Sequence, residues 1–323
     1  MKLGVFTVLY QDESLLQVLD NVKAMGLEAV ELGTGNYPGT AHCDPTELLS
    51  NERKLHELLT ALQIRELDVS ALSCHGNPLH PQNDVAANFH ATWRQTVLLG
   101  EKMGVDVINV FSGCPGDSDQ SMWPNWVTCA WPLDYQRVLE WQWNEKLIPY
   151  WTQEAEYAKQ HGITKIAFEM HPGFMVYNPE TLLRLRKAVG ESIGANFDPS
   201  HLVWQGIEPV EAIKVLAAND AIFHVHAKDV YLDESNIRRN GILDTKPYDD
   251  VLNRSWTFRS VGYGMDEAVW KRIISVLRVV GYDNVLSIEH EDALASINEG
   301  FSKAVEMLKR CIFKETPAQM WWA

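Results

Sequence analysis

The segment AIFHVHAKDV (residues 221–230) begins like the apolar run of a buried β-strand, yet it places His224, His226, Lys228 and Asp229 within six positions. Buried strands carry ionisable groups only when those groups have partners. Alternate side chains of a strand share a face, so the two histidines point to the same side. The segment therefore predicts a strand whose beginning belongs to the core and whose end forms the wall of a binding site.

Seven further segments of β character occur along the chain, and amphipathic helical stretches such as 14–26 and 209–220 lie between them. The strand segments are KLGVFTV (2–8), AVELGT (29–34), RELDVSALS (65–73), DVINVFS (106–112), TKIAFEM (164–170), IGANFDP (193–199) and NVLSIEHE (284–291). Eight βα units in strict alternation predict an α/β fold, a single (β/α)8 TIM barrel. A doubly wound open sheet is the alternative, but LYQDES (9–14), rather than a glycine-rich phosphate loop, follows the first strand.

The composition contains no shift that would mark a second domain, and 46% of the 323 residues are hydrophobic. We therefore expect one TIM-barrel domain over residues 1–323. Its long connections are predicted at 113–134 and 230–265, both over the C-terminal face of the barrel. A C-terminal tail is expected at 313–323.

The formal net charge of −15 argues against nucleic acid as a partner without excluding it. A nucleic-acid-binding protein needs a basic surface, which this chain lacks overall. No apolar run approaches the roughly 18 residues that a membrane helix requires. The opening MKLGVFTVLY reads as a strand rather than a leader, and the five cysteines include no CxxC pair. We expect a reduced, cytoplasmic protein.

Four residues at the ends of the last four strand segments are the candidate metal ligands. Glu169, Asp198 and His226 are spaced by 29 and 28 residues, about one βα unit, and Glu289 lies near the end of the last strand segment. Because the C-terminal strand ends of a barrel face one site, these side chains are expected to meet there. A single such residue is usually an ordinary polar group, but four on consecutive strands would be a costly accident. Oxygen-rich ligation with one imidazole suits a divalent ion, with Mn²⁺ expected and Mg²⁺, Co²⁺ or Zn²⁺ as alternatives.

Five motifs identify a family resemblance that covers essentially the whole chain. They are CHGNPLHP (74–81), FEMHPG (168–173), NFDPSHLVWQG (196–206), HVHAKD (224–229) and LSIEHE (286–291). Together they resemble the sugar phosphate isomerase/epimerase family, the xylose isomerase-like TIM barrels, with ketose 3-epimerase and inosose dehydratase relatives. The resemblance implies a metal site of the same four residues, with Glu169 and Glu289 also acting as the catalytic acid/base pair.

Substrate contacts are predicted around this site. The resemblance implies His201 and His75 as contacts, and Arg259 is either a further contact or a surface arginine. Lys228, together with Asp229, is expected to border the pocket or to orient it. Tryptophans of the long 113–134 connection, Trp123 foremost, are expected either to form a lid over a sugar or to pack at a helix or subunit interface. His171, His290 and Glu291 are interpreted as ordinary polar groups.

The predicted function is a divalent-metal-dependent isomerase or epimerase of a keto-sugar or sugar derivative, working by proton abstraction next to a carbonyl through an enediolate. The alternative is a lyase or dehydratase that eliminates a leaving group after the same step, as in inosose dehydration or cleavage of 3-keto C- or O-glycosides. An AP endonuclease is disfavoured because strand four, ending NVFSG (109–113), offers no histidine. The expected partners are a small-molecule carbohydrate and further copies of the chain, with no nucleic acid or membrane.

Overall fold

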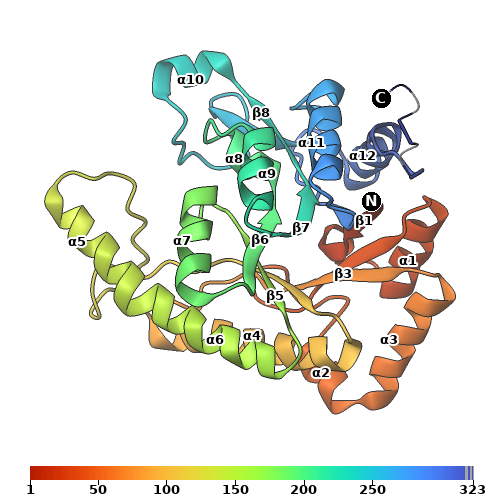
Figure 1. Cartoon of the computed structure of the whole chain (residues 1–323), viewed down its shortest axis with the longest axis horizontal. Coiled ribbons are helices and arrows are strands. Elements are labelled where there is room, and N and C mark those ends of the chain that lie inside the picture. Colours follow the sequence, from red (N-terminus) through yellow and green to blue (C-terminus); the bar gives the residue numbers. More distant parts are fainter. Residues whose placement is uncertain (317–318, 321, 323) are drawn as a thin grey trace.

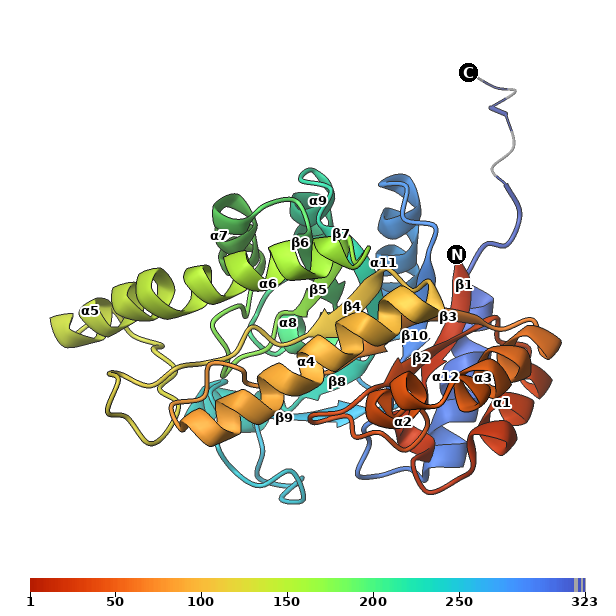
Figure 2. The same cartoon turned by 90° about the horizontal axis from the view of Figure 1, so that it is seen from below.

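The computed structural model describes residues 1–316, 319–320 and 322, and eight of its strands close into a parallel barrel (Figures 1 and 2). These strands are β1 (Lys2–Phe6), β2 (Ala29–Gly33), β3 (Asp68–Ser73), β4 (Val107–Val110), β5 (Lys165–Glu169), β6 (Ile193–Phe197), β7 (Ile222–Ala227) and β10 (Val285–Ile288). Each pairs with the barrel strand before it and the barrel strand after it in the chain, and β10 pairs with β1 to close the ring. Parallel strands covered on both faces need apolar side chains on both, which explains their nearly continuous hydrophobic runs. The predicted barrel is confirmed.

Helices surround the barrel and fill the chain between its strands (Figure 1). They are the 3₁₀ helix η1 (Thr7–Tyr10), α1 (Leu15–Ala24), α2 (Pro45–Ser50), α3 (Glu52–Ile64), α4 (Asn83–Met103), α5 (Leu133–Trp141), the π-helix η2 (Gln142–Leu147), α6 (Ile148–Gln160), α7 (Pro179–Val189), α8 (Pro199–Val203), α9 (Pro209–Ala217), α10 (Glu234–Asn240), α11 (Glu267–Val279) and α12 (Ile297–Cys311). Gly104, with φ of 71°, ends α4 in the left-handed conformation that favours glycine. Of the helices in the described part of the chain, none combines the length and apolarity needed to span a bilayer.

An ion pair between the partly exposed Arg94 and the buried Glu154 joins the two long helices on one side of the barrel. Glu154 on α6 accepts hydrogen bonds from Trp93 Nε1 at 2.8 Å and from Arg94 Nε and Nη2 at 2.7 Å, both on α4. Close to this pair, the Trp151 ring packs edge-on against Phe168 of β5. A buried carboxylate with three donors is a stabilising contact, because its lone pairs are occupied.

The connection after β4 leads into a projecting helical arm. Figures 1 and 2 show α5 extending away from the barrel and continuing through η2 into α6. None of the α5 residues is buried, and Trp131 just before it is 75% exposed. Trp126, in contrast, packs edge-on against Tyr177 with ring centroids 5.4 Å apart. Exposed apolar side chains on this arm do not test whether copies of the chain associate. The homo-oligomer therefore stays a prediction.

The connection after β7 is more structured than the sequence predicts. It contains an antiparallel pair of strands, β8 (Asp229–Leu232) and β9 (Trp256–Arg259), with α10 between them. Asp229 is the first residue of β8 rather than a pocket residue. Its carboxylate accepts hydrogen bonds from the backbone N–H groups of Gly262 and Met265 and from Trp270 Nε1. Of the two predicted roles, Asp229 therefore does not border the pocket, because these donors hold it at the base of the connection.

The predicted tail 313–323 lies only partly within the structure. Residues 317, 318, 321 and 323 lie outside the described residues. In the described part, the Arg278 guanidinium of α11 donates hydrogen bonds to the carbonyl oxygens of Phe313 and Glu315. The start of the tail therefore lies against α11.

Candidate active site

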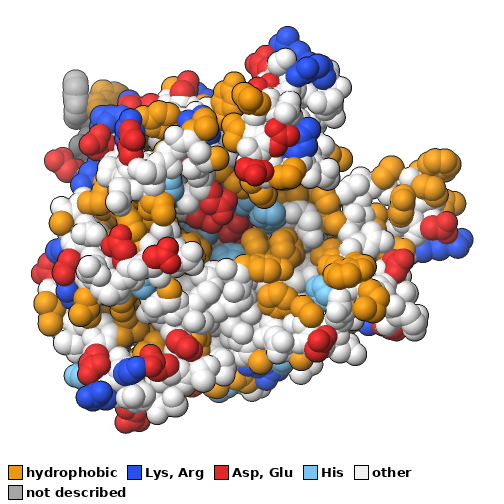
Figure 3. Space-filling model, turned by 180° about the vertical axis from the view of Figure 1, so that it is seen from behind, with side chains coloured by type: hydrophobic (Ala, Val, Ile, Leu, Met, Phe, Trp, Pro, Cys, Tyr) orange, Lys and Arg blue, Asp and Glu red, His pale blue; other side chains and the backbone are white. Residues whose placement is uncertain are grey.

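A cavity of about 530 Å³ opens at the C-terminal ends of the barrel strands. Figure 3 shows the hollow, with acidic and histidine side chains at its base and apolar side chains beside them. The apolar part of the lining includes five aromatic rings, namely those of Phe6, Tyr37, Phe111, Tyr248 and Phe258. The lining thus combines a charged base with walls that suit the C–H faces of an organic ligand.

The four predicted metal ligands meet at this base. One ligand atom from each of Glu169, Asp198, His226 and Glu289 lies within 4.8 Å of the others. Glu169 is the last residue of β5 and His226 the last but one of β7, while Asp198 and Glu289 directly follow β6 and β10. The parallel register of these four adjacent strands places their ends at one level.

Several buried polar atoms in this cluster lack hydrogen-bond partners among the described residues. They include Asp198 Oδ2, Glu289 Oε2 and both ring nitrogens of His201. Glu289 Oε2 nevertheless lies 2.9 Å from His226 Nδ1, and Asp198 Oδ2 lies 3.3 Å from His201 Nε2. Buried donors and acceptors are almost always satisfied, so atoms that converge without hydrogen bonds indicate a site for a cation. Three carboxylates and one imidazole are a donor set that fits a divalent metal ion.

The pKa shifts within the cluster also indicate a site for a cation. Burial raises the pKa of Asp198 to about 6, and the neighbouring carboxylates of Glu169 and Glu289 add to that rise. Burial opposes ionisation of Glu289 too, but Lys228 and His226 outweigh it and lower its pKa to about 2. For His226, the desolvation is outweighed by Glu31 and Glu289, so its pKa is raised well above the usual value. The buried carboxylates raise the pKa of the neighbouring histidine, so they favour a positive charge at this place. A divalent cation would therefore stabilise the cluster.

His226 connects the cluster to a second buried carboxylate, Glu31 of β2. His226 Nδ1 faces the cluster, and Nε2 lies 3.0 Å from Glu31 Oε1 and Oε2. Glu31 also accepts hydrogen bonds from Ser73, Asn109 and Ser287. Burial opposes its ionisation, but His226 and His224 more than offset this and its pKa is lowered. A carboxylate that holds one ring nitrogen of a ligating histidine fixes the orientation of the other.

Glu31, His224 and His226 also lie close enough together to hold a metal ion. The ring nitrogens of His224 are already occupied, Nδ1 by Asn196 Oδ1 at 2.9 Å and Nε2 by Ser70 Oγ at 3.1 Å. Burial lowers the pKa of His224 to about 4, so it is neutral near pH 7. His224 therefore offers no free ligand atom, and this group supports the cluster beside it.

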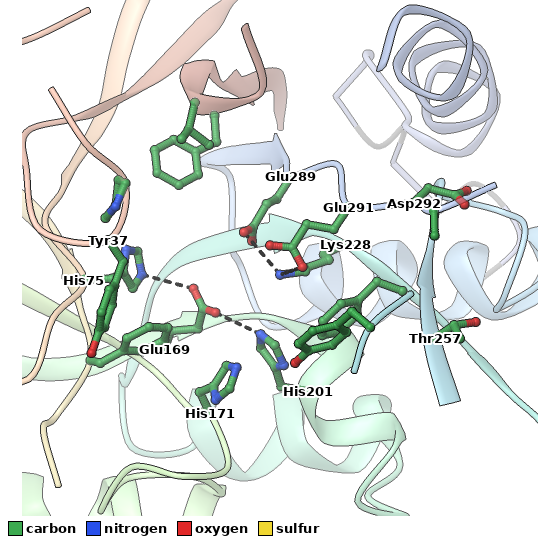
Figure 4. Close-up of a pocket in the computed structure, with 17 residues that line it drawn as sticks. Tyr37, His75, Glu169, His171, His201, Lys228, Thr257, Glu289, Glu291 and Asp292 are labelled. Carbon is green, nitrogen blue, oxygen red and sulfur yellow. Dashed lines mark hydrogen bonds and ion pairs between the residues drawn. The ribbon is translucent and has the colours of Figure 1, made fainter. Parts of the chain in front are cut away.

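Three of the predicted substrate-contacting residues lie in the cavity lining, around Glu169 and Glu289 (Figure 4). His75 Nε2 is 3.1 Å from Glu169 Oε2, and His201 Nε2 is 3.0 Å from Glu169 Oε1. The buried Lys228 places Nζ 3.2 Å from Glu289 Oε1. Each proposed catalytic glutamate therefore keeps contact with a positively charged or hydrogen-bonding neighbour beside the cavity.

The other two predicted contacts lie elsewhere. Arg259 is outside the lining, where its Nε donates to Asp292 at 3.2 Å, and Asp292 itself borders the cavity. Trp123 is 72% exposed and is also outside the lining. The structure therefore does not bring Arg259 or Trp123 to the cavity. Arg259 is held away from the cavity by its ion pair with Asp292. Trp123 lies on the 113–132 connection, which runs outward from the barrel.

The cavity also contains residues that the sequence did not single out as contacts. Glu291 lies 3.1 Å from Lys228 Nζ, and His171 packs on His201 with ring centroids 4.1 Å apart. Taken singly in the sequence, both resemble ordinary polar groups, yet both line the cavity. Tyr248 and Phe258 come from the connection after β7 and stack on one another. The alternation WTFR (256–259) was the one available signal for the strand that carries Phe258.

Comparisons with known proteins agree with this architecture. The family profile described as xylose isomerase-like TIM barrel matches residues 19–311. The uncharacterized protein YfiH of Bacillus subtilis (strain 168) is 37% identical over 297 residues, which cover 91% of this chain and 94% of that protein.

Solved structures share the fold over most of the chain. A D-tagatose 3-epimerase-like protein superposes with a TM-score of 0.64 at 19% identity, covering 96% of this chain and 98% of its own. The probable 3-DHS dehydratase AsbF from Bacillus anthracis gives 0.64 at 18% identity, covering 96% of this chain and 99% of its own. The IOLI protein, with a bound zinc atom, gives 0.62 at 17% identity and 96% coverage of both chains. From the family match over residues 19–311 and the closed eight-stranded barrel, this chain belongs to the xylose isomerase-like TIM barrel family.

Proposed function

We propose that the protein is a divalent-metal-dependent isomerase or epimerase that acts on a keto-sugar or sugar derivative. The observation that carries the proposal is the pair of glutamates at the cavity base. Glu169 and Glu289 come from β5 and from the end of β10, two strands separated in the barrel by β6 and β7. Each has one oxygen at the metal-ligand cluster, and both line the cavity.

Glu289 is the better-placed proton acceptor of the two. Its Oε2 has no hydrogen-bond partner among the described residues, and Lys228 helps to keep the carboxylate ionised. Glu169 Oε2 accepts a hydrogen bond from Asn196 at 3.1 Å, and His201 and His75 lie 3.0 and 3.1 Å from its two oxygens. One carboxylate would remove the proton next to the carbonyl, and the other would return a proton from the opposite side. When bound, the metal ion supplies Lewis-acid polarisation of the substrate carbonyl.

Asp198, His226, Glu169 and Glu289 would hold the ion, and its identity is part of the proposal. Oxygen-rich ligation with one imidazole favours Mn²⁺, with Mg²⁺ and Co²⁺ next. The zinc atom in the IOLI structure supports a divalent ion in this fold and keeps Zn²⁺ among the candidates.

Elimination is the second candidate reaction, and the aromatic part of the cavity lining favours it. The cavity extends from the glutamates to the stacked rings of Tyr248 and Phe258, which would accommodate an apolar leaving group. Proton abstraction by Glu289 would then be followed by departure of that group instead of reprotonation. One structural neighbour is a probable dehydratase, which supports a reaction of this kind.

The test is a screen of metal-free and metal-loaded protein against keto-sugars and 3-keto-glycosides, with product masses measured in deuterium oxide. Isomerisation or epimerisation leaves the mass unchanged apart from deuterium taken up next to the carbonyl. Dehydration yields a product lighter by one water, and glycoside cleavage releases the aglycone. Turnover that is equally fast without metal, or absent for every carbonyl sugar, would contradict the proposal.

A further inference from the structure

Lys228 is the one lysine of the cavity lining, and within the described residues no arginine joins it there. Its Nζ lies 3.2 Å from Glu289 Oε1, 3.1 Å from Glu291 Oε2 and 4.4 Å from the centre of the Phe258 ring. The lysine side chain is buried, so its charge is directed at these neighbours rather than at solvent. An anionic substrate would need a positive group in the cavity, but Lys228 is already paired with two carboxylates.

Glu291 makes few contacts that would explain its position by the fold alone. Its side chain is 51% exposed, and Lys228 is its one ion-pair partner among the described residues. The adjacent Asp292 is different, because it accepts hydrogen bonds from Arg259, Ser260 and the Leu294 backbone and so holds the connection after β10. Glu291 is thus a carboxylate placed at the cavity beside the lysine.

The charges around the cavity sum to a negative value even with a metal ion in place. A divalent cation would be outweighed by Glu169, Asp198 and Glu289, while Glu291 cancels Lys228 and Arg259 cancels Asp292. A phosphate or carboxylate on the substrate would meet this field at close range, and like charges at an interface cost binding free energy. The aromatic walls, in contrast, accept uncharged C–H surfaces.

We infer that the site selects uncharged sugar substrates, and that Glu291 is the specificity-determining residue that rejects phosphorylated or carboxylated ones. The inference rests on the proposed function only in treating this cavity as the sugar-binding site. Glu291 acts by neutralising Lys228 and by adding a negative charge at the cavity wall. Lys228 is then free to orient Glu289 rather than to bind an anion.

The test compares Glu291→Gln with the wild type and with Glu234→Gln. Glu234, on α10, is exposed, pairs with Arg238 and lies outside the cavity lining, so its substitution changes the net charge equally. Inorganic phosphate is titrated calorimetrically into each full-length protein, with and without Mn²⁺. We expect phosphate to bind Glu291→Gln on the order of tenfold more tightly than the other two proteins, because one unit of negative charge has been removed within a few ångströms.

Three outcomes would overturn the inference: tight phosphate binding by the wild type, an equal gain in Glu234→Gln, or no measurable gain in Glu291→Gln. A second measurement compares D-fructose with D-fructose 6-phosphate as competitors in any turnover assay found by the carbonyl-sugar screen. The wild type should prefer the uncharged sugar, and Glu291→Gln should lose most of that preference. The phosphate titration needs no turnover, so a failed screen would contradict the proposed function without deciding the selectivity.

Discussion

Two buried groups of carboxylates and histidines lie next to each other in this barrel, and they differ in how well they are satisfied. Glu31 is surrounded by donors from four residues, including His226. The neighbouring cluster of Glu169, Asp198 and Glu289 keeps polar atoms without hydrogen bonds at close range. The residue types are the same, but a saturated carboxylate supports its neighbours, whereas an unsaturated group can bind a cation. His226 belongs to both groups, with one ring nitrogen in each.

The largest effect is expected from Glu289→Gln, which tests the unsaturated group. The amide keeps the size of the side chain but cannot accept the substrate proton, so turnover in the carbonyl-sugar assay should fall by about a hundred- to ten-thousand-fold. The measurement is kcat on the best substrate of the screen, with thermal unfolding to verify the fold. Glu234→Gln, the matched loss of one surface charge, should retain activity. Full activity in Glu289→Gln would remove Glu289 from the catalytic pair.

Asp198→Asn is expected to abolish metal-dependent stabilisation. An ion that binds only the folded state stabilises it by about 2.7 kcal/mol at a hundred times its dissociation constant. For a chain of this size that amounts to a rise of several degrees in Tm. Differential scanning calorimetry with Mn²⁺ and with EDTA should show this rise in the wild type and not in Asp198→Asn. An unchanged rise in the variant would place the ion elsewhere.

Glu31→Gln tests the saturated group and should have an intermediate effect. All four ligands remain, but the amide no longer holds His226 Nε2 as a carboxylate does, so Mn²⁺ affinity should fall by roughly ten- to a hundredfold. Isothermal titration calorimetry measures that affinity directly. The matched control is Glu154→Gln, an equally buried carboxylate between α4 and α6, which should destabilise the fold by about 1–3 kcal/mol without changing Mn²⁺ affinity. If both variants lose affinity equally, the loss is a consequence of stability and not of His226.

The smallest effect is expected from Trp123→Ala. Because its side chain is 72% exposed and outside the cavity lining, kcat and KM should change by less than about twofold. Steady-state kinetics on the best substrate would measure this. A large rise in KM would mean that the 113–132 connection closes over the bound sugar, which would return the tryptophan to the site.

Much of the fold could be predicted from the sequence because it depends on local periodicity. The eight barrel strands lie where apolar runs alternate with helical stretches, and glycines such as Gly104 mark helix ends. The β8–β9 pair could not be, since four-residue strands in a long polar connection produce a weak pattern. The role of Asp229 could not be decided from the sequence either, because its donors from Gly262 and Met265 are more than thirty residues away.

The sequence by itself determined the barrel and the four candidate ligands, because strand spacing fixes which residues end at one level of a closed parallel sheet. Only the tertiary structure decided the rest. It separated the saturated Glu31 from the unsaturated cluster, paired Glu291 with Lys228, and directed Arg259 to Asp292 and Trp123 to the surface. Such choices depend on which side chains from distant segments meet, and on how many donors reach each buried carboxylate, and neither is encoded in local periodicity.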